Sequence, residues 1–176
     1  MKTAELRVAQ TWDGQPAGPS ECVRVALQLT DLELHVQVDA PFHGDAQPAA
    51  GPGSSDRLWE YEVVELFLLG AERRYLELEL GPWGHYLVLR LEGPRNAVES
   101  GISIAYQAER ADDSWTGRAR IDRSHLPPGL RAANAYAIHG SGSGRRYLAA
   151  HPVPGPAPDF HRLEFFQPLA WRLAGA

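Results

Sequence analysis

The chain has 176 residues, of which 44% are hydrophobic and 22% charged, and this predicts one compact domain over residues 1–176. Its formal net charge of −5 gives no general electrostatic reason to bind nucleic acid or an anionic membrane, so we expect neither as a partner. The single cysteine, Cys22, excludes a disulfide framework and a cysteine-based zinc site. The first residues hold no apolar leader segment and no apolar run approaches the length of a transmembrane helix, which predicts a cytoplasmic protein.

Apolar residues alternate with polar ones along most of the chain, which is the pattern of β-strands. Residues 23–29 and 32–38 are two such stretches around a tight turn and predict a hairpin. The continuous apolar run at 63–69 predicts a central strand that is buried on both faces. A second hairpin and further strands are predicted at residues 75–80 with 87–91, and at 102–108, 115–121, 136–139, 146–149 and 163–166.

About ten short strands without alternating helices predict an all-β fold, namely an antiparallel β-sandwich of the jelly-roll, carbohydrate-binding-module type. Two long connections interrupt this pattern, at residues 40–56 and 151–159, and both are rich in proline. Loops of this length are either binding loops or disordered spacers.

Most of the common catalytic signatures are missing from the sequence. It contains no HExxH zinc motif, no Walker loop and no nucleophile elbow, because Gly142 stands where the serine of an elbow belongs. The glycine-rich stretch 140–144 precedes two arginines but opens no helix, so we expect a hairpin loop there rather than a phosphate cradle.

Residues 58–91 contain most of the candidate functional side chains. Glu77 and Glu79 are two apart on a predicted strand, so they project from the same face about 6.5–7 Å apart. If the strand that holds Glu65 pairs nearby, three carboxylates and Arg90 share one sheet surface. That surface is either a solvated face of cross-strand ion pairs or a ligand site. Glu65 interrupts an apolar strand, which costs free energy unless the carboxylate is paired or faces a site.

The series formed by Trp59, VVELFL, YLELEL, GPWG and LVLRL resembles the family-nine carbohydrate-binding modules, which are related to DOMON-like domains. In that family a tryptophan ahead of the strand stacks on a sugar ring, and strand carboxylates with an arginine bind its hydroxyls. The resemblance implies Trp59, Glu65, Glu79 and Arg90 as the corresponding residues. The family's second stacking tryptophan has no clear match, and the setting of Trp171 is unlike that motif.

A second series of motifs runs along nearly the whole chain: TWDG at 11–14, LWEYEVVELF at 58–67, AIHGS at 137–141, RRY at 145–147, PVP at 152–154 and PDFHRLEFF at 158–166. On these motifs the chain is identified as a member of an uncharacterised-protein family whose human member is known as a chromosome-four open reading frame. That resemblance implies no established activity.

The histidines form a separate group of candidates. His139 ends a predicted strand, and His151 and His161 flank the second proline-rich loop, so the three either converge on one rim or are structural. Because a metal needs three or more ligands within reach of one ion, we expect structural histidines and no metal. We expect no haem or other cofactor either, since Met1 is the only methionine and the axial ligand of a DOMON-type haem has no candidate.

Two functions fit these residues. The first is a binding module that takes a saccharide or a similar polyol as its small-molecule ligand on one sheet face, since indole rings suit the apolar face of a sugar and carboxylates suit its hydroxyls. The second is a small glycoside hydrolase or epimerase with two carboxylates as acid and base, and of the two we favour binding over catalysis. The candidate ligand-binding residues are Trp59, Glu65, Glu77, Glu79, Arg90, His139 and His161.

Overall fold

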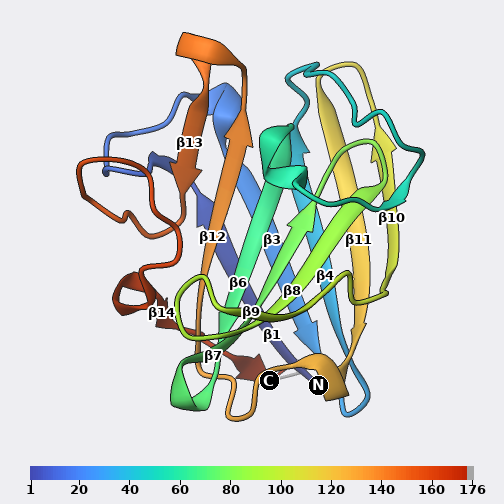
Figure 1. Cartoon of the computed structure of the whole chain (residues 1–176), viewed down its shortest axis with the longest axis vertical. Coiled ribbons are helices and arrows are strands. Elements are labelled where there is room, and N and C mark those ends of the chain that lie inside the picture. Colours follow the sequence, from blue (N-terminus) through green and yellow to red (C-terminus); the bar gives the residue numbers. More distant parts are fainter. Residues whose placement is uncertain (174–176) are drawn as a thin grey trace.

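Alternation of apolar and polar residues produces strands with one buried face, and here these strands assemble into a β-sandwich of two sheets. The computed structural model describes residues 1–173. Sheet A has the strand order β10-β11-β4-β3-β1-β15, and sheet B has the order β2-β13-β12-β6-β7-β8-β5, with β9 on β8 and β14 on β12. In Figure 1 the strands of sheet B lie over those of sheet A.

The fifteen strands of the described residues vary from two to nine residues in length. Those of sheet A are β1 (Lys2–Val8), β3 (Val23–Leu29), β4 (Glu33–Pro41), β10 (Ala105–Arg110), β11 (Ser114–Asp122) and β15 (Arg172–Leu173). Those of sheet B are β2 (Gln10–Thr11), β5 (Gly53–Ser54), β6 (Val63–Leu69), β7 (Arg74–Leu80), β8 (His85–Glu92), β9 (Ala97–Ser100), β12 (Ala132–His139), β13 (Arg146–Ala149) and β14 (Gln167–Pro168).

The fold therefore confirms the predicted all-β class and the antiparallel sandwich, with one exception in the pairing. Strand β5 lies within the long connection at 40–56 and pairs with β8 in parallel. Residues 1–173 contain 3-10 turns but no α-helix. Accordingly, no described helix has the length and hydropathy needed to cross a membrane.

The main hydrophobic core fills the space between the two sheets. Every second residue of the central strands contributes to it, and the two hairpins predicted from the sequence, β3–β4 and β7–β8, both form. The inward side chains include Val25, Leu27, Val36, Leu66, Leu76 and Leu78, all of them at most 2% exposed.

A second apolar cluster lies on the outer face of sheet B, under the segment that follows β13. Val153, Phe160 and Phe166 of that segment pack over the strands, and the Phe160 ring stacks on Tyr136 with ring centroids 3.8 Å apart. Strand β6 is consequently buried on both faces, as its continuous apolar run predicts. This third layer covers only part of the face, and the uncovered part forms the candidate site.

The strands differ from the sequence prediction in two ways. Residues 163–166 were predicted to be a strand, but Leu163–Phe165 is a 3-10 turn in which the Phe166 backbone N–H donates to the Leu163 carbonyl. The prediction was wrong because a segment that covers a sheet buries apolar residues just as a strand does, so the two look alike in the sequence. Strand β1 was missed because its apolar alternation is regular only in its second half, and β2, β5, β9, β14 and β15 were missed because they are only two to four residues long.

A substitution at Gly70 can test the packing of the loop at 127–128 against the edge of the sandwich. A Cβ at this position would lie 2.3 Å from the Pro128 carbonyl oxygen and 2.8 Å from Pro127 Cβ. Both contacts are too short, so Gly70→Ala has to displace the loop at 127–128. We expect a loss of about 1–3 kcal/mol in the free energy of unfolding, measured by urea denaturation.

Gly51→Ala is the matched control, because no heavy atom lies within 4 Å of the point that a Cβ would occupy there. It should change the free energy of unfolding by less than about 0.5 kcal/mol. Equal stability of the two variants would contradict the packing at Gly70.

Candidate functional site

Three carboxylates lie side by side on the outer face of sheet B. The strand register places Glu65 of β6 opposite Glu79 of β7, and Phe67 of β6 opposite Glu77. Directly opposed residues have Cβ atoms about 4.5–5.5 Å apart. The three side chains are buried, with exposed fractions of 3% for Glu65, 4% for Glu77 and 0% for Glu79.

A pocket of about 340 Å³ opens above two of these carboxylates. The sheet supplies Glu65 and Glu77 as its floor, whereas Trp59 comes from the 3-10 turn η2 (Leu58–Glu60) that precedes β6. Trp59 is 40% exposed, so an indole face is accessible at the rim. The remaining lining residues are Leu89, Leu91, Arg95, Ala97, Ile138, Tyr147, Pro158, Phe160 and His161.

The carboxylates have fewer partners than buried charges require. Glu77 Oε2 and both oxygens of Glu79 are buried without a hydrogen-bond partner among residues 1–173. A buried acceptor without a partner costs about 1–3 kcal/mol, and more when it is charged. Native proteins rarely retain such groups unless a ligand, water or proton satisfies them.

Protonation removes part of this cost. Burial raises the pKa of Glu77 from 4.5 to about 8. Burial, together with the neighbouring Glu65 and Glu77, raises the pKa of Glu79 to about 10. Burial and the charge of Glu77 also raise the pKa of Glu65 well above its ordinary value, and Arg145 opposes that shift. At neutral pH these buried carboxyl groups therefore hold protons, and their hydroxyl groups act as hydrogen-bond donors.

Arg145 positions the tryptophan at the pocket rim. Its Nη2 atom donates to the backbone carbonyls of Trp59 at 2.6 Å and of Tyr61 at 3.3 Å, and its Nη1 atom donates to the Gly140 carbonyl at 2.8 Å. The guanidinium thus ties the turn η2 to the hairpin between β12 and β13. In the sequence Arg145 is recognisable only as a neighbour of the glycine-rich loop, and its place at the site was missed.

A hydrogen bond from Tyr75 holds His161 at the pocket wall. The Tyr75 hydroxyl accepts a hydrogen bond from the Arg95 backbone N–H at 3.1 Å and lies 2.7 Å from His161 Nδ1. The tautomer of the imidazole ring sets which of the two groups donates in this pair. Burial lowers the pKa of His161 to about 4, so the ring is neutral at physiological pH.

The structure brings together only some of the candidate ligand-binding residues. Trp59, Glu65, Glu77 and His161 line the pocket, and Glu79 lies beside Glu65 without lining it. Arg95, Tyr147 and Phe160 also line it and were missed: Arg95 lies in a turn and Phe160 in a covering segment, which carry no periodic signal, and Tyr147 lies on β13, whose position beside the pocket the sequence does not show. The other two candidates, Arg90 and His139, lie elsewhere.

Arg90 lies on the opposite face of sheet B, so the expected surface shared with the carboxylates was wrong. Its register partner is Leu76, which faces the core between the sheets, whereas Leu89 is the residue opposite Glu77. The guanidinium forms an ion pair with Glu99 at 2.8 Å. Sequence alternation shows that residues share a face within one strand, but not how two strands are in register.

His139 belongs to a separate cluster. Its ring stacks on His43 with centroids 3.5 Å apart, and its Nε2 atom lies 3.2 Å from Glu21 Oε1. His151 instead hydrogen-bonds through its backbone to the Asn134 side chain. The three histidines therefore do not gather at the pocket, and residues 1–173 contain no group of three or more His, Cys, Asp or Glu side chains that could hold a metal ion.

Comparison with known proteins identifies relatives over nearly the whole chain. No family model matches. The UPF0462 protein C4orf33 homolog of Danio rerio is 40% identical over 172 residues, which cover 93% of this chain and 87% of that protein. The chain belongs to the UPF0462 family. Its Mus musculus relative is 40% identical, with 95% and 91% covered, and its Homo sapiens relative is 38% identical, with 93% and 86% covered. The membership predicted from the sequence is thereby confirmed.

Solved structures share the fold at low sequence identity. A proposed carbohydrate-binding protein from Bacteroides uniformis aligns with a TM-score of 0.72 and 18% identity, covering 95% of this chain and 84% of that one. A family-nine carbohydrate-binding module from Caldicellulosiruptor kristjanssonii, in complex with cellotriose, aligns with a TM-score of 0.50 and 14% identity, covering 85% and 72%. These likenesses confirm the predicted fold class.

The raised pKa values make the stability of this protein depend on pH. Above pH 4.5 the unfolded chain releases protons that the folded protein retains on Glu77 up to about pH 8 and on Glu79 up to about pH 10. The stabilisation is complete below the unfolded value and is lost as the pH rises through the folded values. We expect the free energy of unfolding to fall by at least about 1 kcal/mol between about pH 6 and pH 9.

Glu77→Gln should reduce this pH dependence, because it removes one titrating group and the charge that acts on its neighbours. Guanidinium denaturation at each pH measures the effect. Glu109→Gln, an exposed carboxylate on sheet A, is the control and should retain the wild-type dependence. The same slope in Glu77→Gln as in wild type would show that Glu77 ionises normally.

Proposed function

We propose that this UPF0462 protein binds a small saccharide or a similar polyol in the pocket on the outer face of sheet B. The observation that carries the proposal is the buried Glu77 on the pocket floor, whose Oε2 atom has no hydrogen-bond partner among residues 1–173, beside Glu65 and beneath the exposed Trp59. A ligand hydroxyl in the pocket supplies the hydrogen bond that Glu77 lacks. The apolar face of a sugar ring suits the exposed indole of Trp59.

The protonation of the three buried carboxyl groups favours a neutral ligand over a charged one. Because burial raises the pKa of Glu77 to about 8 and of Glu79 to about 10, the site is far less negative at neutral pH than three carboxylates suggest. A cation would find little negative charge to compensate it. A hydroxyl group can both accept from a protonated carboxyl and donate to an ionised one.

The walls of the pocket fit the same ligand class. Tyr147 and Phe160 add aromatic surface to the lining, and the neutral His161 ring adds a polar group. The pocket volume of about 340 Å³ lies within the range of small-molecule sites. The structural neighbour in complex with cellotriose supports a saccharide, although its 14% identity relates the two proteins by fold alone.

Catalysis by the same carboxylates is the less favoured function. An acid and base pair needs one carboxyl that is protonated and one that is ionised at the working pH. Here burial raises the pKa of all three groups, so none is clearly set apart as an ionised base or nucleophile. We therefore propose binding rather than glycoside hydrolysis or epimerisation.

Isothermal titration calorimetry with a panel of monosaccharides, cello-oligosaccharides and polyols tests the proposal. Trp59→Ala should weaken binding of the best ligand at least about tenfold, through loss of the stacking surface. Glu65→Leu should abolish hydrogen bonding to the ligand while retaining the shape of the buried side chain. Its stability should be equal to that of wild type or higher, because an apolar group replaces a buried carboxyl without a strong partner.

Glu60→Gln is the control, since Glu60 is an exposed neighbour on the same turn that does not line the pocket. Binding by this variant should match wild type. No heat of binding across the panel would refute the saccharide proposal. Loss of stability in Glu65→Leu, with binding retained, would make Glu65 a structural residue.

A further inference from the structure

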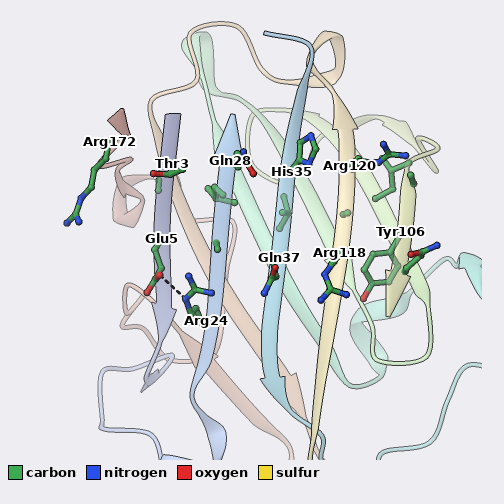
Figure 2. Close-up of a pocket in the computed structure, with 18 of the residues that line it drawn as sticks. Thr3, Glu5, Arg24, Gln28, His35, Gln37, Tyr106, Arg118, Arg120 and Arg172 are labelled. Carbon is green, nitrogen blue, oxygen red and sulfur yellow. Dashed lines mark hydrogen bonds and ion pairs between the residues drawn. The ribbon is translucent and has the colours of Figure 1, made fainter. Parts of the chain in front are cut away.

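A second hollow, of about 1,090 Å³, lies on the outer face of sheet A, away from the pocket on sheet B. We call it the sheet A trough. The register of the strands places one residue from each of five neighbouring strands in a straight row across it. Figure 2 shows this row, which consists of Arg120, His35, Gln28, Thr3 and Arg172.

The dimensions of the row suit an extended molecule. Arg120 on β11 and Arg172 on β15 are separated by four strand steps, which at about 4.8 Å each span about 19 Å. A parallel row lies next to it, about 6.5–7 Å further along the strands, and consists of Gln107, Arg118, Gln37, Ala26 and Glu5. The first row, together with the part of the second on β10, β11 and β4, forms a polar track across the strands rather than a cup for a single ring.

The trough carries positive charge with little nearby compensation. Among residues 1–173, neither Arg120 nor Arg172 has a carboxylate within ion-pair distance, and Arg118 meets only the exposed Glu109, at 3.4 Å. By contrast, Arg24 beside the rows is held by Glu5 at 2.8 Å and Asp39 at 3.1 Å. In a chain of net charge −5, three weakly compensated guanidinium groups on one concave face indicate an anionic ligand.

The neutral residues of the trough narrow the class of ligand. Gln28, Gln37 and Gln107 place amide groups in the trough that suit sugar hydroxyls, and the Gln37 amide nitrogen itself donates to Asp39. Trp115 is buried between the sheets, and Tyr106, which lines the trough, donates its hydroxyl to the Gly81 carbonyl. His35 and Tyr106 are the only rings that line the trough among residues 1–173, which is fewer than the series of rings on which successive bases of a single-stranded nucleic acid stack.

We propose that the sheet A trough binds an extended acidic oligosaccharide, whose carboxylates or sulfates pair with Arg118, Arg120 and Arg172 and whose hydroxyls meet the glutamine amides. Guanidinium groups bind such anions through two parallel hydrogen bonds. The proposal concerns a different sheet and a different ligand charge from the pocket on sheet B. Either site can therefore fail without the other.

The experiment is calorimetric titration of the whole chain with oligogalacturonates and heparin-derived oligosaccharides of graded length. Affinity should rise with length until the ligand spans the row, and should fall as salt is added. Arg118→Gln/Arg120→Gln should weaken binding at least about tenfold, since two charge-assisted contacts are lost. Both side chains are exposed, so the variant should fold normally.

Two variants are the controls. Arg131→Gln removes an exposed arginine that does not line the trough and should bind as wild type does. Trp59→Ala alters only the pocket on sheet B and should also retain binding of the acidic ligand. Retention of binding in Arg118→Gln/Arg120→Gln, or no binding of any acidic oligosaccharide, would overturn the proposal. Equal affinity for single-stranded DNA or polyglutamate would show a general polyanion surface and would also overturn it.

Discussion

The burial of three carboxylates on the outer face of two paired strands, β6 and β7, is the constraint on which the rest of this structure depends. Strands β6 and β7 pack their alternate leucines into the core between the sheets, so their other residues must face the outside of sheet B. The segment after β13 covers part of that face. Glu65, Glu77 and Glu79 lie on the same face with at most 4% of their surface exposed, and this burial raises their pKa values.

The two sheets present outer faces of opposite chemistry. Sheet B offers a small, aromatic and largely protonated pocket under its covering layer, whereas sheet A is uncovered and offers a long polar track with weakly compensated guanidinium groups. The difference follows from one element, because the third layer lies on sheet B alone. A face that a third layer covers needs apolar residues such as Phe67 and Tyr136, whereas a face open to water tolerates rows of Arg and Gln.

The fold could be predicted from the sequence further than the site could. Period-two alternation located the two hairpins, and a continuous apolar run located the doubly buried strand β6, because both patterns are local. It could not supply the register that moves Arg90 away from Glu77, which depends on how β7 and β8 pair. It also could not show that Arg145 reaches the carbonyl of Trp59, a contact between residues 86 positions apart. Of the four residues that the motif resemblance implied, Trp59 and Glu65 line the pocket, whereas Glu79 lies beside Glu65 without lining it and Arg90 lies on the opposite face of the sheet.

Arg145 fixes the backbone of the turn η2 at the pocket rim. The turn η2 follows a long proline-rich and glycine-rich connection, and Trp59 on it is partly exposed, so packing alone does not fix the indole. Three hydrogen bonds from one guanidinium to backbone carbonyls do fix the turn, and these bonds do not depend on the side chains of η2. The same positive charge offsets part of the cost of burying Glu65. One arginine therefore joins the stacking surface to the carboxylate floor, so that the rim and the floor of the pocket hold their relative positions before any ligand arrives.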